Sequence, residues 1–147
     1  MVQEWRTERT NWRDAKLSKR HGAWGFNCPA VDLDFVMLEY NYGIPCAIIE
    51  YKHIKAQVVN PTHANYKALA KLADGYKDGP LPCFIARYDP NNWSFQITPL
   101  NEKAAQYYKH CLNEKISEQR FVKSLHLLRK SALNESDIIA IKQLNTK

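Results

Sequence analysis

The chain has 147 residues, of which 45% are hydrophobic and 24% are charged, and its formal net charge is +6. It is long enough for one domain with a real core, and its composition excludes a disordered protein. With no signal peptide and no apolar run of membrane-spanning length, we expect no membrane partner and a cytoplasmic location. The basic excess favours an anionic partner, nucleic acid first of all, although modest positive charge also serves solubility alone.

The cysteines are far apart in the sequence and include no C-x-x-C pair: Cys28, Cys46, Cys83 and Cys111. This spacing argues against a structural zinc site. Three of the four lie in apolar segments, where a buried thiol accounts for them. The cysteine pattern is therefore consistent with the expected cytoplasmic location.

Residues 1–20 are expected to form the first helix, because no glycine or proline occurs before Gly22. Basic residues recur at spacings of three and four along it and form one stripe: Arg6, Arg9, Arg13, Lys16 and Arg20. An arginine-rich stripe can contact phosphates or simply face solvent. Trp5 and Trp12 lie one heptad apart on a neighbouring face, and if they pack on a sheet, Glu8 lies near the buried side.

The segment from Gly22 to Cys28 is expected to be a short strand or an irregular lead-in. Trp24 and Phe26 alternate within it as core residues do. Packing is therefore preferred to base stacking as the role of these two rings.

Two runs rich in β-branched, aromatic and aliphatic residues follow, Val31 to Tyr40 and Ile44 to Tyr51. Between them, Asn41-Tyr42-Gly43 supplies the asparagine and glycine of a tight turn. We therefore predict an antiparallel hairpin, in which the apolar run Ile44 to Ile49 forms a central strand rather than an edge.

The predicted hairpin carries charged residues, whose presence in two largely apolar strands needs an explanation. Side chains repeat with period two along a strand, so Asp32 and Asp34 share one face of the first strand. Glu50 and Lys52 share one face of the second strand for the same reason. With the turn centred near Tyr42, Asp34 lies across from Glu50 and Lys52. Charges are costly in an apolar setting unless they are paired or bound to a metal.

Two carboxylates and a lysine on adjacent strands suit a magnesium site. Mg²⁺ prefers oxygen ligands and is commonly held by one or two carboxylates together with water and phosphate oxygens. The metal acidifies a bound water, and a lysine two residues after the glutamate can orient or deprotonate that water. The alternative is an ordinary Glu/Lys pair on an exposed strand face, with Asp34 as its salt-bridge partner.

Beyond the hairpin, His53 is expected to point to the face opposite Lys52, whereas Lys55 extends the basic surface beside the site. A helix is predicted from residues 60–62 to about Tyr76, with Thr62 as its N-cap. Its apolar face comprises Tyr66, Leu69, Ala70 and Ala73.

Strands are predicted at Leu81 to Tyr88 and at Trp93 to Thr98, joined by turn residues. Helices follow from the N-cap Asn101 to about Leu112 and from about Ser117 to Ser131. A short last helix carries Ile138, Ile141 and Leu144. These C-terminal helices can complete the core, form a homodimer contact or dock a partner.

An aspartate followed by E-x-K across a hairpin resembles the signature of the PD-(D/E)XK nuclease superfamily, which includes restriction endonucleases, Holliday-junction resolvases and phage exonucleases. The matching residues are D-L-D-F-V at 32–36 and I-I-E-Y-K at 48–52. One departure is that no proline immediately precedes the aspartate, since Pro29 lies three residues before Asp32. E-x-K alone is a weak motif, and its structural context decides its meaning.

The resemblance covers about Trp5 to Thr98 in the order of elements, and only the hairpin in motif. It implies an α/β fold with a restriction endonuclease-like αβββαβ core, in which helices flank a mixed central sheet. We accordingly expect one nuclease-like domain over residues 1–147, with its core at about 5–98 and a C-terminal helical part at about 101–147.

The resemblance also implies roles for the charged residues. Asp34 and Glu50 would be the ligands of Mg²⁺ or Mn²⁺, and Lys52 would position or activate water. Asp32 is a further ligand, or the true one if a bulge shifts the register. The first helix of the resembling family sometimes adds a glutamate, which makes Glu8 a weaker candidate, although an acid that favours the helix dipole explains it as well.

Members of this superfamily often open the helix after the hairpin with Ser-x-x-Gln, whose glutamine lies near the active site. Here Thr62-His63-Ala64-Asn65 has the spacing but lacks the glutamine. Asn65 offers a similar amide and is a candidate for nucleic-acid binding. Lys67 is a candidate for a contact with the nucleic-acid backbone.

The sequence thus predicts a metal-dependent nuclease that hydrolyses phosphodiester bonds, with DNA favoured because most resembling proteins act on DNA. One alternative is a nucleic-acid-binding module on the same fold that has lost its chemistry, although an intact Asp34, Glu50 and Lys52 argues against it. Another is a protein-binding or inhibitor factor that uses the C-terminal helices. A phage or mobile-element origin suits a nuclease of this size.

Overall fold

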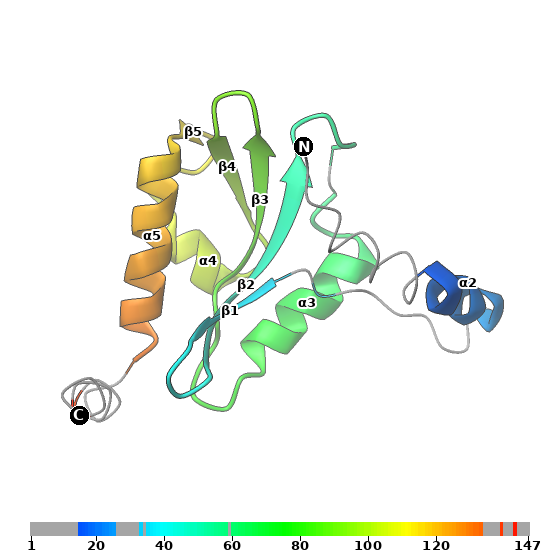
Figure 1. Cartoon of the computed structure of the whole chain (residues 1–147), viewed down its shortest axis with the longest axis horizontal. Helices are drawn as coiled ribbons and strands as arrows, with labels where there is room; N and C mark the ends of the chain where they lie inside the picture. The colour runs from blue at the N-terminus through cyan, green and yellow to red at the C-terminus, as the bar shows by residue number, and fades with distance from the viewer. Residues whose placement is uncertain are drawn as a thin grey trace. The chain divides into compact units, whose positions relative to one another are not determined.

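The computed structural model describes residues 15–25, 33, 35–58, 60–133, 139 and 143. By its internal contacts the chain divides into two units, residues 1–32 and residues 33–147. The described part of the second unit forms one five-stranded sheet with helices on both of its faces (Figure 1).

The elements in chain order are α2 (Ala15–Ala23), β1 (Phe35–Glu39), β2 (Ile44–His53), α3 (Ala64–Asp74), β3 (Cys83–Asp89), β4 (Ser94–Pro99), α4 (Glu102–Tyr107), β5 (Lys115–Ile116) and α5 (Glu118–Ser131). The strand order is β1-β2-β3-β4-β5. β2 and β3 are parallel, whereas every other neighbouring pair is antiparallel. The sheet is therefore mixed and the α/β class is confirmed, while the restriction endonuclease-like arrangement stays a prediction.

The predicted hairpin is confirmed. β1 pairs antiparallel with β2, with Phe35 opposite Ile49, and Gly43 closes the turn with φ of 63°. This left-handed conformation carries no steric cost for glycine. β2 extends to His53, beyond its predicted end, whereas Leu33 lies outside β1, so the first strand is shorter than predicted.

A bulge interrupts the hairpin near its turn. Met37 pairs with Ala47 but Leu38 pairs with Pro45, so Cys46 is the extra residue of β2. Proline has no N–H for the ladder and is found at edges and bulges, which accounts for the irregularity here. Side chains alternate with period two along a strand. The extra residue therefore changes which residues of β1 share a face with which residues of β2 on one side of the bulge relative to the other.

The sheet is covered on both faces. α4 and α5 lie on one face (Figure 1), where Phe84, Ile97 and Phe121 are buried in one core cluster. α3 lies on the other, where Leu69 packs in a second cluster with Ile48. β2 contributes buried side chains to both clusters, as predicted for a central strand.

The helix starts agree with the sequence at one position and differ at another. Asn101 is the N-cap of α4, as predicted, and accepts a hydrogen bond from the N–H of Ala104. α3 begins after His63, and the predicted N-cap Thr62 is wrong. The N–H and hydroxyl of Thr62 both donate to Oδ1 of Asn60, at 3.0 and 2.7 Å, which ties Thr62 into the preceding turn.

Several other boundaries differ from prediction. α4 ends at Tyr107, short of Leu112, and residues 115–116 form β5, which the sequence did not indicate. α2 runs through Gly22, and Trp24 is 50% exposed, so its predicted core role is wrong. Residues 1–14 of the predicted first helix, Phe26 and the apolar residues of the predicted last helix lie outside the described residues.

Glu39, at the end of β1, is a fully buried carboxylate. Its Oε1 accepts a hydrogen bond from Nη2 of Arg129 on α5, and its Oε2 accepts one from the N–H of Tyr42, each at 3.0 Å. Burial pushes the pKa of Glu39 upward. The hydrogen bonds from Tyr42, Arg129 and the N–H of Asn41 outweigh burial, so the pKa lies below its ordinary value of 4.5. Glu39 thus joins the hairpin turn to α5.

This interaction predicts an acid dependence of stability. The pKa of Glu39 is lower in the folded than in the unfolded protein, so its contribution is fully present above about pH 4.5 and is lost as pH falls through the folded-state value. We expect Arg129→Met to lower the melting temperature by several degrees at pH 7, because the buried carboxylate loses its cation. Urea unfolding of the wild type at pH 7 and at pH 3 measures how much stability is lost when Glu39 becomes protonated. A Glu39→Gln protein that loses as much stability on acidification as the wild type would contradict it.

Candidate active site at the end of β2

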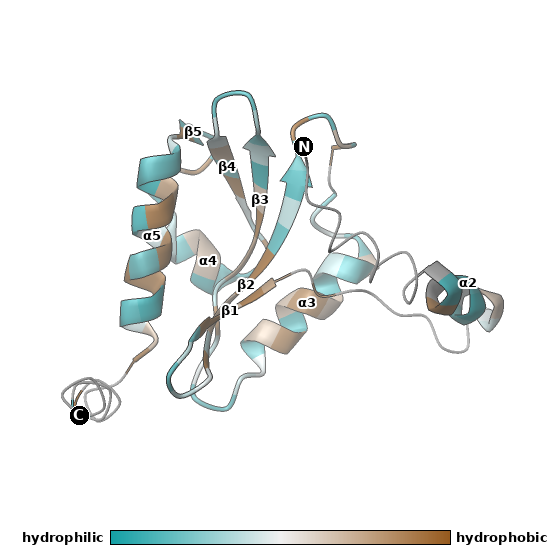
Figure 2. Ribbon diagram, in the orientation of Figure 1, coloured by the Kyte–Doolittle hydropathy of each residue, from teal (hydrophilic) through white to brown (hydrophobic). Residues whose placement is uncertain are grey.

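Glu50 and Lys52 are brought together by β2, as the sequence predicted. Nζ of Lys52 lies 3.0 Å from Oε1 of Glu50, and Glu50 is only 9% exposed. Ile48 packs against α3, so Glu50 and Lys52, at alternate positions beyond it, lie on the same face. Figure 2 shows β2 changing from hydrophobic to hydrophilic toward its end. The pair therefore lies where the strand leaves the core.

The opposite face of β2 fixes the orientation of the pair. The ring of Tyr51 lies between Glu50 and Lys52 in the sequence and contacts Phe35 and Phe121, at centroid distances of 5.0 and 6.2 Å. Phe121 belongs to α5 and is fully buried. With Tyr51 held on the α5 side, its two neighbours are directed to the α3 side.

Arg87 is a residue of this region that sequence reasoning missed. It is the register partner of Lys52 on β3, and its Nη2 donates to the carbonyl oxygens of Ile54 and Ala56, at 2.8 Å for the latter. Arg87 therefore holds the loop that follows Lys52 against β3. The sequence does show an arginine at the polar end of the predicted strand Leu81 to Tyr88. Only the parallel register of β2 and β3, however, places this arginine beside Lys52.

Most of the other predicted site residues lie outside the described residues: Asp34, Asp32, Glu8, Arg6, Arg9 and Arg13. Phe35, which follows Asp34 in the chain, pairs with Ile49, which precedes Glu50. The pairing of β1 with β2, which already includes the shift caused by the bulge, therefore extends to the residues adjacent to Asp34 and Glu50.

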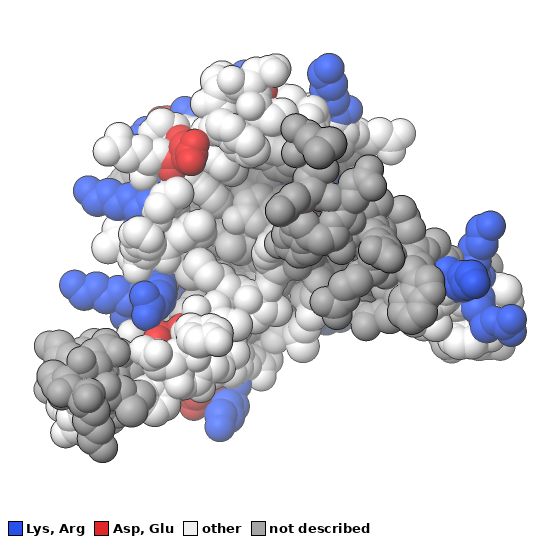
Figure 3. Space-filling view, in the orientation of Figure 1, with Lys and Arg blue, Asp and Glu red and all other residues white. Residues whose placement is uncertain are grey.

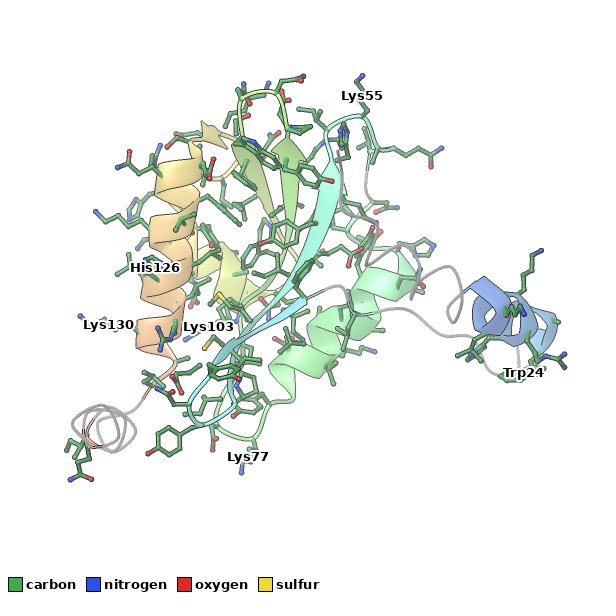
Figure 4. The ribbon with its side chains drawn as sticks, viewed as in Figure 1. Trp24, Lys55, Lys77, Lys103, His126 and Lys130 are labelled. Carbon is green, nitrogen blue, oxygen red and sulfur yellow. The ribbon has the colours of Figure 1, made fainter. Side chains whose placement is uncertain are left out.

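The remaining predicted contacts are exposed. Lys16 and Arg20 lie on α2, which belongs to the first unit. Asn65 and Lys67 lie on α3, the helix that packs on the same sheet face as Glu50. Lys55 follows β2, and Figure 4 shows its side chain pointing away from the sheet at that end.

Basic residues also follow α5, the helix predicted at about Ser117 to Ser131. Figure 3 shows Lys and Arg side chains along this helix. They are Arg120, Lys123, Arg129 and Lys130. Arg129 is the partner of Glu39, so at least this one serves the fold.

The described residues fit a hard metal ion only in part. No group of three or more His, Cys, Asp or Glu side chains suited to a metal occurs among them. Glu50 offers carboxylate oxygens at the edge of the core, and Mg²⁺ is commonly held by one or two carboxylates with water completing its shell. The donor chemistry is therefore suitable, and Asp34 remains the predicted second ligand.

Two hollows, each of about 690 Å³, lie away from this pair. One is lined by Tyr107 of α4, Tyr108 directly after it and Leu127 of α5, together with their neighbours, and the other includes Pro45 and Leu133. Neither is lined by Glu50 or Lys52. A long polymer needs no enclosed pocket, so the Glu50–Lys52 pair at the edge of the core is the better candidate for chemistry on nucleic acid, whereas a small apolar ligand would favour the hollows.

No family model, curated protein or solved structure matches this chain. The likeness to the PD-(D/E)XK superfamily therefore rests on the hairpin residues themselves. None of the helices in the described ranges is long and apolar enough to cross a membrane.

The role of Arg87 can be tested through the loop it holds. We expect Arg87→Met to raise amide hydrogen exchange in residues 54–58 by tenfold or more, because two carbonyl oxygens lose their donor and the loop opens more often. Arg87→Lys should give an intermediate result, since one ammonium cannot reproduce the planar fork. Hydrogen exchange with mass spectrometry provides the measurement, and Lys123→Met is a control on α5. Unchanged exchange in Arg87→Met would show that the loop is held by other contacts.

Proposed function

We propose that the protein is a metal-dependent nuclease that hydrolyses phosphodiester bonds in nucleic acid, with DNA as the favoured polymer. The observation that carries the proposal is the Glu50–Lys52 pair, 3.0 Å apart on one face of a central strand. The strand is joined to β1 by an antiparallel hairpin, which is the context that the resembling motif requires.

Glu50 is proposed as a metal ligand. A carboxylate at the edge of the core is costly unless it is paired or bound to a cation, and Lys52 already pairs with its Oε1. Asp34 is proposed as the second carboxylate ligand. When bound, Mg²⁺ or Mn²⁺ supplies Lewis-acid stabilisation of the phosphate and a more acidic water.

Lys52 is proposed to orient the attacking water or the phosphate. Its side chain is 31% exposed, so the ammonium reaches solvent while Glu50 fixes its direction. In the reaction, the water oxygen forms a bond to phosphorus and one P–O ester bond breaks. The water gives up a proton to a base or to solvent, and the leaving oxygen ends as a hydroxyl. An ammonium placed beside the phosphate also stabilises the charge that develops in this step.

The charges around the pair suit a polyanion. Arg87 lies in register beside Lys52, Lys55 follows in the next loop, and the chain as a whole carries a net charge of +6. Such an excess of cations attracts nucleic acid and makes its binding dependent on salt. These features support nucleic acid as the substrate class, and the choice of DNA over RNA comes from the resemblance.

The proposal predicts metal-dependent cleavage that requires both residues of the pair. We expect Glu50→Gln and Lys52→Met each to lower the cleavage rate by a factor of roughly 100 or more, as is usual when a ligand or a charge-stabilising group is lost. The assay uses labelled single-stranded, double-stranded and branched DNA and RNA, each with Mg²⁺, Mn²⁺ or EDTA. Circular dichroism and melting curves confirm that each variant is folded.

Matched controls change exposed residues of the same types. Glu114→Gln and Lys123→Met, both exposed, should cleave as the wild type does. Salt-dependent binding without cleavage under any metal would replace the proposal with a nucleic-acid-binding module. Neither binding nor cleavage would reduce the pair to a structural salt bridge and favour a protein-binding factor.

A further inference from the structure

Three aromatic side chains form a row at the end of the sheet where the proposed site lies. His53 ends β2, and Tyr88 is its register partner on β3, with ring centroids 5.4 Å apart. Trp93 follows β3 in the next turn and stacks on Tyr88, with centroids 6.1 Å apart and an angle of 14° between the rings. The row therefore crosses from the end of β2 to the turn between β3 and β4.

This aromatic row lies beyond the core. On the same sheet face, Phe95 stacks on Phe121 with centroids 4.2 Å apart, and both rings pack in the main cluster with Tyr51. His53 and Trp93 take no part in that cluster as the described residues define it. Trp93 is 47% exposed. Core packing accounts for the inner rings but not for an exposed tryptophan at the rim.

The backbone holds Trp93 in a costly conformation. Its φ is 51°, in the left-handed region that asparagine and glycine adopt with less strain than a bulky residue. Side chains fix the turn before and after it: Oδ1 of Asp89 accepts from the N–H of Asn91, and Oδ1 of Asn92 accepts from the N–H of Ser94. These hydrogen bonds preorganise the turn, and with it the position of the Trp93 indole.

A cation lies beside the aromatic row. Lys55 is exposed, and its N–H donates to Nδ1 of His53 at 3.0 Å, which orients the imidazole. Figure 4 shows the Lys55 side chain extending from the loop at this end of the sheet. Asp89 is the carboxylate of the same turn, and it is engaged with the N–H of Asn91. Flat rings, with an exposed ammonium on the loop that contacts them, match the two parts of a nucleotide, its base and its phosphate.

We propose that His53, Tyr88 and Trp93 form a stacking platform for unpaired nucleobases, with Lys55 on the adjoining phosphate. Aromatic platforms beside a basic groove are a general means of binding single strands, because every base has a face on which a ring can stack. Consecutive residues of a strand point to opposite faces, so the platform and the Lys52 side lie on the two faces of the same strand ends. A single strand that crosses this edge of the sheet meets both.

The substrate class follows if the proposed function is also right. The nuclease would then act on single strands or on strands with unpaired bases, and fully paired duplex would be the poorer substrate. This step rests on the proposed function, whereas the binding of unpaired bases does not.

The test measures binding in EDTA, where metal-dependent cleavage cannot occur. Fluorescence anisotropy compares a labelled oligo-dT of roughly 12 nucleotides, long enough for one single-strand site, with an abasic strand of the same length. The wild type should bind oligo-dT at least about fivefold more tightly than the abasic strand, because only the former offers bases to stack. Equal affinity for the two strands would overturn the platform without any variant.

Variants then locate the effect. Trp93→Asn removes the ring but introduces a residue that tolerates a positive φ. It should weaken oligo-dT binding by roughly five- to a hundredfold and leave the affinity for the abasic strand unchanged. Trp93→Phe, which keeps a ring, should recover most of the loss. Tyr40→Ala removes another exposed aromatic, in the turn at the far end of β2, and should change nothing. Full oligo-dT affinity in Trp93→Asn would place the bases elsewhere.

The salt dependence of binding distinguishes the contribution of the Trp93 ring from that of the Lys55 charge. Lys55→Ala should lower the slope of log affinity against log salt by about 0.7, the value for one phosphate contact on a single strand, whereas Trp93→Asn should leave the slope unchanged. If the wild type cuts no nucleic acid but binds oligo-dT through Trp93, the platform stands and the nuclease proposal fails. If the wild type cuts but Trp93→Asn binds normally, the nuclease proposal stands and the platform fails.

Discussion

The burial of β2 on both faces is the constraint on which the rest of the structure depends. Cys46, Ala47, Ile48 and Ile49 are all buried. Ala47 and Ile49 pack in the cluster on the α5 side, and Ile48 packs in the cluster on the α3 side. A slip of one residue would exchange the side chains that pack toward α5 with those that pack toward α3, so the close packing on both faces opposes it. Glu50 is the last buried residue of this run and follows Ile49 directly, so the packing of the core determines where the carboxylate lies and which way it points.

The parallel pairing of β2 with β3 then brings the polar residues together. Parallel neighbours end at the same edge of a sheet, so Lys52 lies beside Arg87 on one face and His53 beside Tyr88 on the other. Ligands of open α/β sheets commonly bind outside the carboxyl ends of their strands. In this protein the same edge offers cations on one face and aromatic rings on the other. A polymer that carries both charge and flat bases can use both.

Much of the fold could be predicted from the sequence where the signal is local. The β-branched runs and Gly43 were sufficient for the hairpin, and Asn101 was recognisable as a helix cap. Positions decided by particular side-chain contacts or by strands distant in the sequence were missed. Thr62 has the chemistry of an N-cap, but its N–H and hydroxyl donate to Asn60, two residues before it. β5 has only two residues, too short for any periodicity, and it exists because Phe95 and Gln96 offer it an edge.

The candidate site divides in the same way. The i,i+2 spacing of Glu50 and Lys52 fixed their common face before the fold was known, and the structure confirms it. Arg87 could not be predicted, because its place beside Lys52 depends on the parallel register and its bonds run to a loop more than thirty residues away in the sequence. The aromatic row combines three segments, and the sequence shows none of their stacking. The part assigned to Asp34 remains a prediction from the motif.

The most direct measurement of the central claim is anomalous diffraction from crystals of the wild-type protein soaked in Mn²⁺, with Glu50→Gln crystals treated alike. We expect a manganese peak at ligand distance, about 2.0–2.3 Å, from the Glu50 carboxylate, with a second oxygen ligand from the hairpin. The peak should be absent from the variant. A well-ordered Glu50 still paired with Lys52, with manganese bound elsewhere or not at all, would contradict the metal site and leave this pair a structural one.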